Sequence, residues 1–259
     1  MGGRAATALR LRAEDALDRA RGRRDPLVPP RRRWGSVGQG DFVAIGDEFL
    51  AHLVELADLT PASDVLDAGC GIGRIARPLA GFLTTGTYAG FDVDRDAIGW
   101  CASRYPADRF RFDVADLRNA RYNPHGTEDA TSYRFPYDDD SFDVVVMTSV
   151  LTHLLAPAAE RYLAESRRVL RPGGRLLATF FLLDDDSRAA IAAGRAAIGF
   201  FDAEAETAIA DQAVPEEAVA YDAGWVRERV PVERIEPGAW RGAGVARPRS
   251  FQDIVIACA

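Results

Sequence analysis

The sequence predicts an α/β fold: a doubly wound, mostly parallel seven-stranded sheet with an antiparallel C-terminal hairpin and an N-terminal helical arm. Short apolar strands alternate with helical stretches from residue 64 onward, which is typical of a parallel sheet covered on both faces. No helix separates the last two strands, so they must pair antiparallel. The 259 residues, 47% hydrophobic and 27% charged, suffice for one such domain.

The chain is predicted to begin with a basic arm and linker over residues 1–40. A helical pattern covers residues 5–21, and Gly22 with the prolines after it ends that pattern. Ten Arg and four acidic residues give the arm a charge of +6, and since the whole chain carries −7, the remainder carries −13. Only the arm is therefore suited to attract a polyanion.

Residues 41–259 are predicted to form the domain itself. Its first helix is expected over 42–58, because apolar residues recur there at helical spacing after Asp41, which suits a helix cap. The alternating part predicts strands at 64–67, 87–92, 109–113, 142–147 and 175–183, with helices near 73–83, 94–105 and 157–170. The tail predicts a helix over 215–223 that ends at Gly224, then strands near 225–235 and 250–257.

A glycine-rich loop after the first predicted strand is the most specific motif. It reads Asp67-Ala68-Gly69-Cys70-Gly71-Ile72-Gly73 and leads into a helix, so the backbone there can approach a ligand closely. A dinucleotide-binding loop would need a glycine where this chain has Arg74. The carboxylate of Asp67 would repel a diphosphate and attract an ammonium group. These charges favour S-adenosylmethionine, which carries an ammonium and a sulfonium and no phosphate.

Two further acidic residues stand where a nucleotide would lie. Asp92 ends the second predicted strand, 19 residues after Gly73, where a carboxylate can accept from both ribose hydroxyls. Its alternative role is to cap the next helix, for which Asp94 competes. Asp116 follows the third strand and is placed to accept from the adenine amino group. Asp113 competes for that role, and a simple turn residue is an equal alternative for Asp116.

Longer motifs extend this pattern toward a known family. The first loop reads DAGCGIG, the region of the fourth strand reads FPYDDDSFDVVVMTSVLTHL, and RVLRPGGRLLATFF leads into the fifth strand. With these motifs, the stretch from Val65 to Phe181 resembles class I S-adenosylmethionine-dependent methyltransferases. The resemblance implies a Rossmann-like fold, a methyl-transferring enzyme and S-adenosylmethionine as cofactor. It places the expected cofactor contacts at Asp67, Gly69, Cys70, Gly71, Gly73, Asp92, Asp116 and Ser149.

The acceptor end is expected at the same edge of the sheet. His153 follows the fourth strand, and the ordinary pKa of histidine suits a general base at neutral pH, with pocket shaping as the alternative role. Three segments exceed what the fold needs, and such loops usually build binding pockets: the arm through Trp34–Asp41, 118–140 and 184–214. We expect substrate-pocket residues at Trp34, Tyr122, His125 and Tyr133.

Several other classes of function and site are disfavoured by the sequence. The three cysteines and three histidines lie far apart, and the Asp138–Asp140 and Asp184–Asp186 runs lack calcium-loop spacing, so no metal site is predicted. No apolar run is long enough for a membrane span, and the start lacks the features of a signal peptide, so a cytoplasmic protein is expected.

The leading hypothesis is methyl transfer to a small molecule, with oxygen favoured as the acceptor atom. Family members that methylate exocyclic amines of bases typically carry Asp/Asn-Pro-Pro-aromatic after the fourth strand, where this chain has Thr148-Ser149-Val150. The alternative is an RNA-directed methyltransferase or RNA-binding factor that uses the Arg-rich arm, which the acidic remainder disfavours. A non-catalytic cofactor-binding module is a third hypothesis. The oligomeric state stays open, and a homodimer is compatible with the arm.

Overall fold

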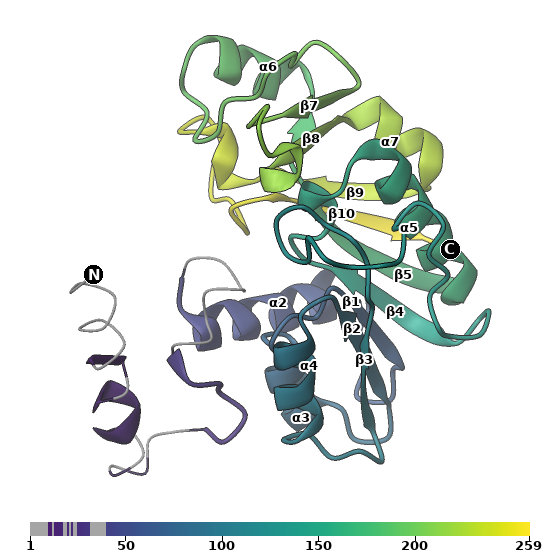
Figure 1. Cartoon of the computed structure of the whole chain (residues 1–259). Helices are drawn as coiled ribbons and strands as arrows, with labels where there is room; N and C mark the ends of the chain where they lie inside the picture. The colour runs from purple at the N-terminus through teal and green to yellow at the C-terminus, as the bar shows by residue number, and fades with distance from the viewer. Residues whose placement is uncertain (1–9, 12, 18–19, 21, 23–24, 32–39) are drawn as a thin grey trace.

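The computed structural model describes residues 10–11, 13–17, 20, 22, 25–31 and 40–259. Seven strands form one sheet in the order β3-β2-β1-β4-β5-β10-β9 (Figure 1). The first five strands run parallel, whereas β10 is antiparallel to both β5 and β9. The mostly parallel sheet with its antiparallel C-terminal hairpin is thereby confirmed. The strands are β1 (Val65–Ala68), β2 (Tyr88–Asp92), β3 (Phe110–Val114), β4 (Phe142–Met147), β5 (Leu170–Phe180), β9 (Val232–Glu236) and β10 (Asp253–Cys258).

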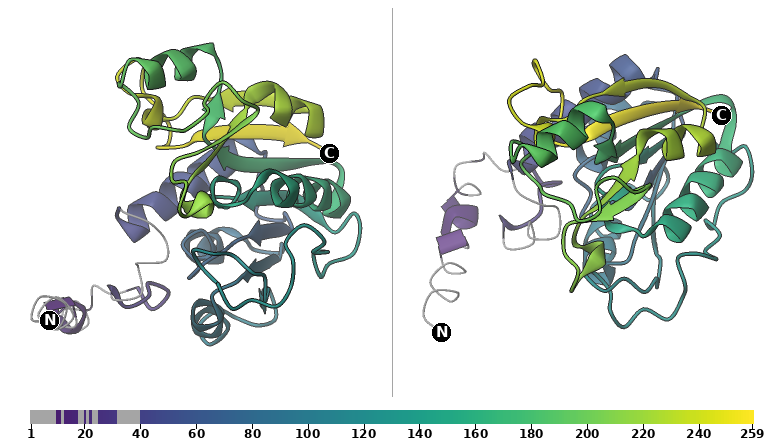
Figure 2. Two further views of the ribbon diagram at one scale, coloured as in Figure 1. Left: turned by 45° about the horizontal axis from the view of Figure 1, so that its top comes forward. Right: turned by 90° about the horizontal axis from the view of Figure 1, so that it is seen from above.

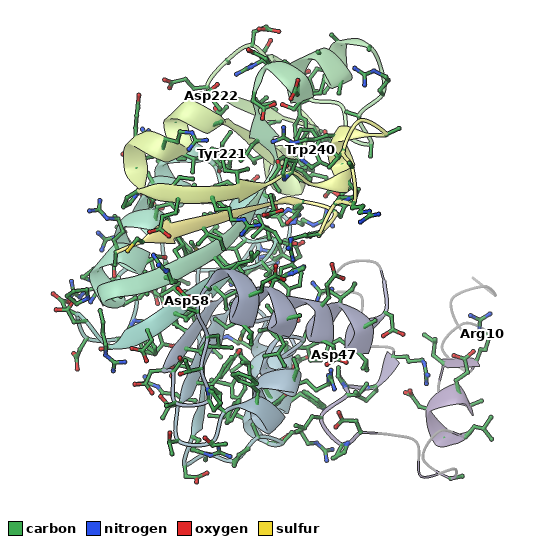
Figure 3. All side chains as sticks on the ribbon, turned by 180° about the vertical axis from the view of Figure 1, so that it is seen from behind. Arg10, Asp47, Asp58, Tyr221, Asp222 and Trp240 are labelled. Atoms are coloured by element: carbon green, nitrogen blue, oxygen red, sulfur yellow. The ribbon has the colours of Figure 1, made fainter. Side chains whose placement is uncertain are left out.

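Helices cover both faces of this sheet because alternate strand residues point to opposite sides. On β4, Val144 and Val146 belong to one apolar cluster with residues of α2, α3 and α4, while Val145 and Met147 belong to another with residues of α5 and α7. Figure 3 shows α2 lying across the first face. The helices are α2 (Phe42–Leu56), α3 (Ala76–Phe82), α4 (Arg95–Ala102), α5 (Ala156–Val169) and α7 (Ala223–Arg229).

The segment after β5 forms a second, small sheet. It has the order β6-β8-β7, formed by β6 (Leu182–Leu183), β8 (Val219–Asp222) and β7 (Thr207–Ile209), and α6 (Asp185–Ala192) accompanies it. In Figures 1 and 2 this unit lies beyond the β9–β10 edge of the main sheet. A third apolar cluster that includes Phe181, Phe200 and Trp240 holds it together. Most of the predicted 184–214 insertion is therefore folded on a core of its own.

The C-terminal helix was predicted at the wrong place. Residues 219–222 of the expected 215–223 helix form β8, which pairs with β6 and β7, and only 215–217 form a single 3-10 turn. The helix α7 starts at Ala223, because the Asp222 side chain caps it by accepting from the backbone N–H of Gly224 and Trp225. Gly224 thus lies inside the first helical turn instead of ending a helix.

The other elements agree with their predicted positions to within a few residues. The helix expected over 73–83 begins only at Ala76, and the strand expected near 225–235 is confined to 232–236, because α7 occupies its first half. In the arm, residues 10–11, 13–17 and 20 are helical, in agreement with the predicted helix, whose remaining residues lie outside those described. The division into arm and domain stays a prediction.

Candidate active site

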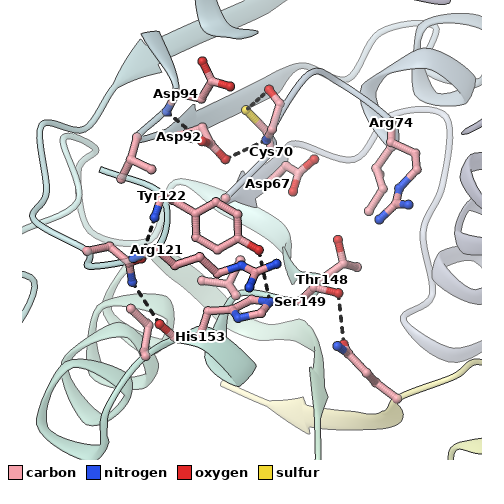
Figure 4. A pocket seen from close by; sticks show the side chains of 18 of the residues that line it. Asp67, Cys70, Arg74, Asp92, Asp94, Arg121, Tyr122, Thr148, Ser149 and His153 are labelled. Atoms are coloured by element: carbon pink, nitrogen blue, oxygen red, sulfur yellow. Dashed lines mark hydrogen bonds between the residues drawn. The ribbon is translucent and has the colours of Figure 1, made fainter. Parts of the chain in front are cut away.

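A cavity of about 950 Å³ opens where β1, β2 and β4 end, at the carboxyl edge of the sheet. This volume lies at the upper end of the range typical of ligand sites. Side chains from α2, the glycine loop, the 117–122 segment, the turn after β4 and the loop before β10 line it. In Figure 4, Asp67 and Arg74 lie at one end of the cavity, and Tyr122 and His153 lie at the other.

The glycine loop forms one wall, and its backbone conformation requires glycine. Gly69, Gly71 and Gly73 all have positive φ, of 86°, 52° and 80°. A Cβ atom on Gly69 would lie 2.2 Å from a methyl carbon of Val150, a residue of the turn after β4 that also lines the cavity. The N–H groups of Gly69 and Cys70 both donate to the Phe91 carbonyl, so these two are used within the protein. The loop therefore contributes a close backbone surface.

Asp67 lies under this loop as a buried carboxylate with one free oxygen. Its side chain is 1% exposed, and Oδ2 accepts from the Tyr88 hydroxyl at 2.9 Å, while Oδ1 has no partner. Burial raises the pKa of Asp67 to about 7, and the nearby charge of Asp92 adds to this effect. A cationic ligand group would both satisfy Oδ1 and lower this pKa, so the position suits an ammonium group.

Arg74 lines the same end of the cavity and carries the opposite charge. Its guanidinium is half-buried, and no described residue forms an ion pair or hydrogen bond with it. Burial lowers its pKa, and the charge of Asp67 works against that shift. Asp67 and Arg74 together present a negative and a positive side chain to one end of the cavity. A zwitterionic amino-acid group would pair with both.

Asp92, at the end of β2, contacts the glycine loop. Its Oδ2 accepts from the Gly71 N–H at 2.8 Å and its Oδ1 accepts from the Asp94 N–H at 2.9 Å. Burial raises the pKa of Asp92, and these two hydrogen bonds oppose the shift. The cap of α4 is Asp94, whose side chain accepts from the N–H groups of Asp96 and Ala97. The helix-cap role considered for Asp92 thus falls to Asp94, which leaves Asp92 facing the cavity.

At the other end of the cavity, His153 and Tyr122 are in contact. The Tyr122 hydroxyl lies 3.3 Å from His153 Nε2, and the two rings meet edge to face at 5.2 Å. His153 Nδ1 lies 2.9 Å from the Glu216 backbone carbonyl, which can only accept, so Nδ1 carries the hydrogen. Burial lowers the pKa of His153. The neutral ring therefore presents the lone pair of Nε2 to the Tyr122 hydroxyl and the cavity.

The segment that carries Tyr122 is fastened at several points. The Asn119 side chain donates to the His153 carbonyl at 3.0 Å and accepts from the N–H groups of Arg121 and Tyr122. Arg121 forms an ion pair with Glu217 and stacks on the Tyr122 ring. These contacts place the tyrosine hydroxyl beside His153 although the ring itself is 42% exposed.

Ser149 joins a polar network on the floor of the cavity. Its φ of 56° is rare for a residue with a side chain, and its N–H donates to Thr179 Oγ1 at 2.8 Å. The Ser149 and Thr179 hydroxyls both donate to Gln252 Oε1, at 3.1 and 2.6 Å. The Gln252 amide in turn donates to Thr152 Oγ1 at 3.4 Å. This network links the turn after β4 to the loop before β10.

Several residues expected in the site lie elsewhere. Asp116 does not line the cavity, because its carboxylate accepts from Thr127 at 2.8 Å and lies 3.4 Å from Arg95, which holds the surrounding loop. The next residue, Leu117, does line the cavity. Gly73, His125 and Tyr133 also lie outside the lining, with His125 exposed and Tyr133 packed on core rings such as Phe91. Trp34 falls outside the described residues.

Other lining residues were not predicted from the sequence. Gln252 lies 103 residues from Ser149, and a strand-end glutamine carries no signal of its own. Phe181 belongs to a run interpreted as strand, and Phe49 to a helix whose apolar stripe was assigned to the core.

Among the described residues, no group of acidic, cysteine and histidine side chains is arranged for a metal ion. Within that part of the chain, no helix is long and apolar enough to span a membrane.

Comparison with known proteins places part of this chain in a family of methyltransferase domains. Residues 66–178 match the family model of a methyltransferase domain. Methyltransferase GfsG of Streptomyces halstedii is 33% identical over 135 residues, which cover 51% of this chain and 42% of that protein. The fatty-acid O-methyltransferase of Mycolicibacterium smegmatis is 33% identical over 139 residues, with 51% and 44% covered. The chain thus spans less than half the length of these two relatives.

Solved structures extend the likeness over more of the chain, at the level of fold. An S-adenosylmethionine-dependent methyltransferase from Mesorhizobium loti has a TM-score of 0.53 and 16% identity, and the match covers 87% of this chain and 100% of that one. Such a match shows that the two chains share a fold.

Proposed function

Because the chain contains a class I S-adenosylmethionine-dependent methyltransferase domain, we propose that it transfers a methyl group from S-adenosylmethionine to an oxygen atom of a small molecule. The observation that carries the proposal is the buried Asp67 carboxylate with an unpartnered oxygen beside the glycine loop. An unpartnered buried polar atom is costly, so its presence at a ligand cavity indicates a partner that the ligand supplies.

The residues at this end fit the amino-acid part of S-adenosylmethionine. Asp67 would accept from the ammonium group, and Arg74, which has no partner among the described residues, would hold the carboxylate. Asp92 would accept from the ribose hydroxyls. We keep Asp116 as a residue near the adenine. Through its contacts with Thr127 and Arg95 it would position the loop that follows β3. When bound, the cofactor supplies an electrophilic methyl group on a positively charged sulfur.

His153 is proposed as the general base at the acceptor end. The Glu216 carbonyl holds the hydrogen on Nδ1, so the lone pair of Nε2, which faces the Tyr122 hydroxyl, would take the proton of an acceptor hydroxyl that displaces Tyr122 from it. The lowered pKa keeps the imidazole neutral near pH 7. The related fatty-acid O-methyltransferase acts, by its name, at oxygen, and this supports the same acceptor atom here.

Calorimetric titration with S-adenosylhomocysteine tests the cofactor part of the proposal. We expect binding to the full chain, weakened about tenfold or more by Asp67→Asn, because a charge-assisted hydrogen bond is lost. The amide can still accept from Tyr88 and removes a buried charge, so the thermal midpoint should not fall. Asp186→Asn, at an exposed position in the first turn of α6, is the matched control and should bind like the unchanged chain. Equal affinity in both variants would refute the assignment of Asp67.

A further inference from the structure

The half of the cavity away from Asp67 has an aromatic wall. Phe181, which is 3% exposed, packs edge to face against Trp240 at 5.3 Å and against Phe251 at 6.3 Å. Phe181 and Phe251 both line the cavity, and the Phe251 ring is 50% exposed. An exposed aromatic ring that leans on a buried, rigid one forms a surface that gains free energy when an apolar ligand covers it.

The helix α2 contributes a second apolar surface to the cavity. Ile45 and Phe49 line the cavity from that helix. The His52 Nε2 atom lies 3.0 Å from the Arg249 carbonyl, and the Arg249 guanidinium donates to both carboxylate oxygens of Glu55. These contacts tie α2 to the loop that carries Phe251. The loop that carries Phe251 is therefore fixed to the helix that carries Phe49, and both side chains line the cavity.

The charges in this half are already engaged or lie in solvent. Arg121 pairs with Glu217, and Arg118 is exposed at the rim. Glu48 lies 3.4 Å from His52 Nε2. Among the described residues that line this half, no buried cation is left for a carboxylate or phosphate on the acceptor. An anionic acceptor would therefore lose its hydration without a buried partner, which is costly.

The polar end of this half suits an uncharged hydroxyl group. The Tyr122 hydroxyl can accept a hydrogen bond from the cavity side while it donates to His153 Nε2, or it can leave the single lone pair of Nε2 to a donor on the ligand. A neutral hydroxyl can donate to either atom. An ammonium group would find the carboxylate of Glu217 already paired with Arg121, and a carboxylate has no hydrogen to donate to Nε2.

We infer that the acceptor is an uncharged, largely apolar alcohol or phenol, whose hydroxyl lies at Tyr122 and His153 and whose body covers the aromatic wall of Phe181 and Phe251. This inference rests on the proposed function and specifies its substrate class. It predicts that, among acceptors of similar size, neutral hydroxyl compounds bind more tightly than carboxylates or amines.

The test uses three probes with one biphenyl body: 4-phenylphenol, biphenyl-4-carboxylate and 4-(aminomethyl)biphenyl. Each is titrated by calorimetry into the full chain saturated with S-adenosylhomocysteine. We expect the phenol to bind at least about tenfold more tightly than either charged probe, because burying an unpaired charge is costly. Phe251→Asp should weaken phenol binding about tenfold. Tyr122→Phe should reduce the preference for the phenol over the carboxylate.

Matched controls separate these effects from loss of structure. Val54→Asp changes another exposed apolar residue, on α2, that does not line the cavity, and Tyr133→Phe removes a hydroxyl outside it. Both should bind the phenol like the unchanged chain. Equal or tighter binding of a charged probe, no binding of any probe, or no effect of Phe251→Asp would overturn the inference. Failure of S-adenosylhomocysteine itself to bind would instead refute the proposed function.

Discussion

At the scale of single residues, Asp67 combines a cost to stability with a use in binding. Its carboxylate is buried, and its pKa is raised to about 7, so the charged form is disfavoured in the free protein. Since the folded pKa exceeds that of the unfolded chain, this residue makes the fold less stable as pH rises from about 4 through 7. A ligand cation reverses the effect, because it stabilises the charged carboxylate.

The affinity for S-adenosylhomocysteine should therefore depend on pH. Binding of an ammonium group needs the deprotonated carboxylate, so affinity should rise from pH 5 to 7, by up to about tenfold per pH unit. Calorimetry over this range measures the slope. Asp67→Asn should bind weakly with a flat profile near pH 7, which separates its titration from those of the neighbouring Asp92 and Arg74. A steep slope retained in the variant would assign the dependence to another group.

His153 should stay neutral and keep one tautomer through the same range. Burial disfavours the imidazolium, so its titration midpoint should lie below 6.5, and the Glu216 carbonyl should hold the hydrogen on Nδ1. Long-range ¹H–¹⁵N spectra of the histidine-labelled protein report both properties directly. His153→Gln identifies the signal by its disappearance. A ring that carries its hydrogen on Nε2 at pH 7 would contradict the proposed general base.

At the scale of elements, one buried carboxylate joins the hairpin strand β10 to the small sheet. Asp253 is completely buried, and it accepts from Trp240 Nε1 at 2.8 Å, from Arg241 Nε at 2.7 Å and from the Leu182 N–H at 2.8 Å. Arg241 also pairs with Asp184 at 2.6 Å. Asp253 thus fastens Trp240, on which Phe181 of the aromatic wall packs, to the main sheet.

Removal of this anchor should be strongly destabilising. Asp253→Ala leaves the buried Nε of Arg241 and three further donors, from Leu182, Gly238 and Trp240, without their acceptor, so the free energy of unfolding should fall by about 3–5 kcal/mol. Denaturant unfolding measures the loss, with Glu233→Ala as the control. Glu233 pairs with Arg175 on the exposed edge, and its removal should cost less than about 1 kcal/mol. Similar losses in both variants would contradict the role of Asp253.

At the scale of the whole molecule, ligand binding should be coupled to thermal stability. The cavity is lined by α2, the glycine loop and the turn after β4, so a ligand there connects elements that are far apart in sequence. S-adenosylhomocysteine at a hundredfold excess over Kd should add about 2.7 kcal/mol and raise the melting temperature by roughly 5–10 °C. Differential scanning fluorimetry measures this shift. The RNA alternative predicts a comparable rise with a short RNA oligonucleotide, which we do not expect from a chain whose acidic residues outnumber its basic ones.

Much of the fold and part of the site followed from local patterns in the sequence. Strand and helix periods depend on neighbouring residues, so the alternation from 64 to 183 predicted the strands and helices there. The glycine loop, Asp67 and Asp92 could be predicted as well, because they lie next to strand ends. The 219–222 strand was missed because its residues suit a helix by spacing, and only pairing with β6 and β7 makes them extended.

The sequence by itself determined the main sheet, the carboxylate beside the glycine loop and the class of cofactor, because each depends on residues close together along the chain. The tertiary structure alone decided that Asp94 caps α4 in place of Asp92, that Asp116 faces its own loop, and that Glu216 orients His153. It also decided that Phe181 and Phe251 form one wall. These are contacts between distant segments, and their geometry exists only once the sheet and its loops have packed.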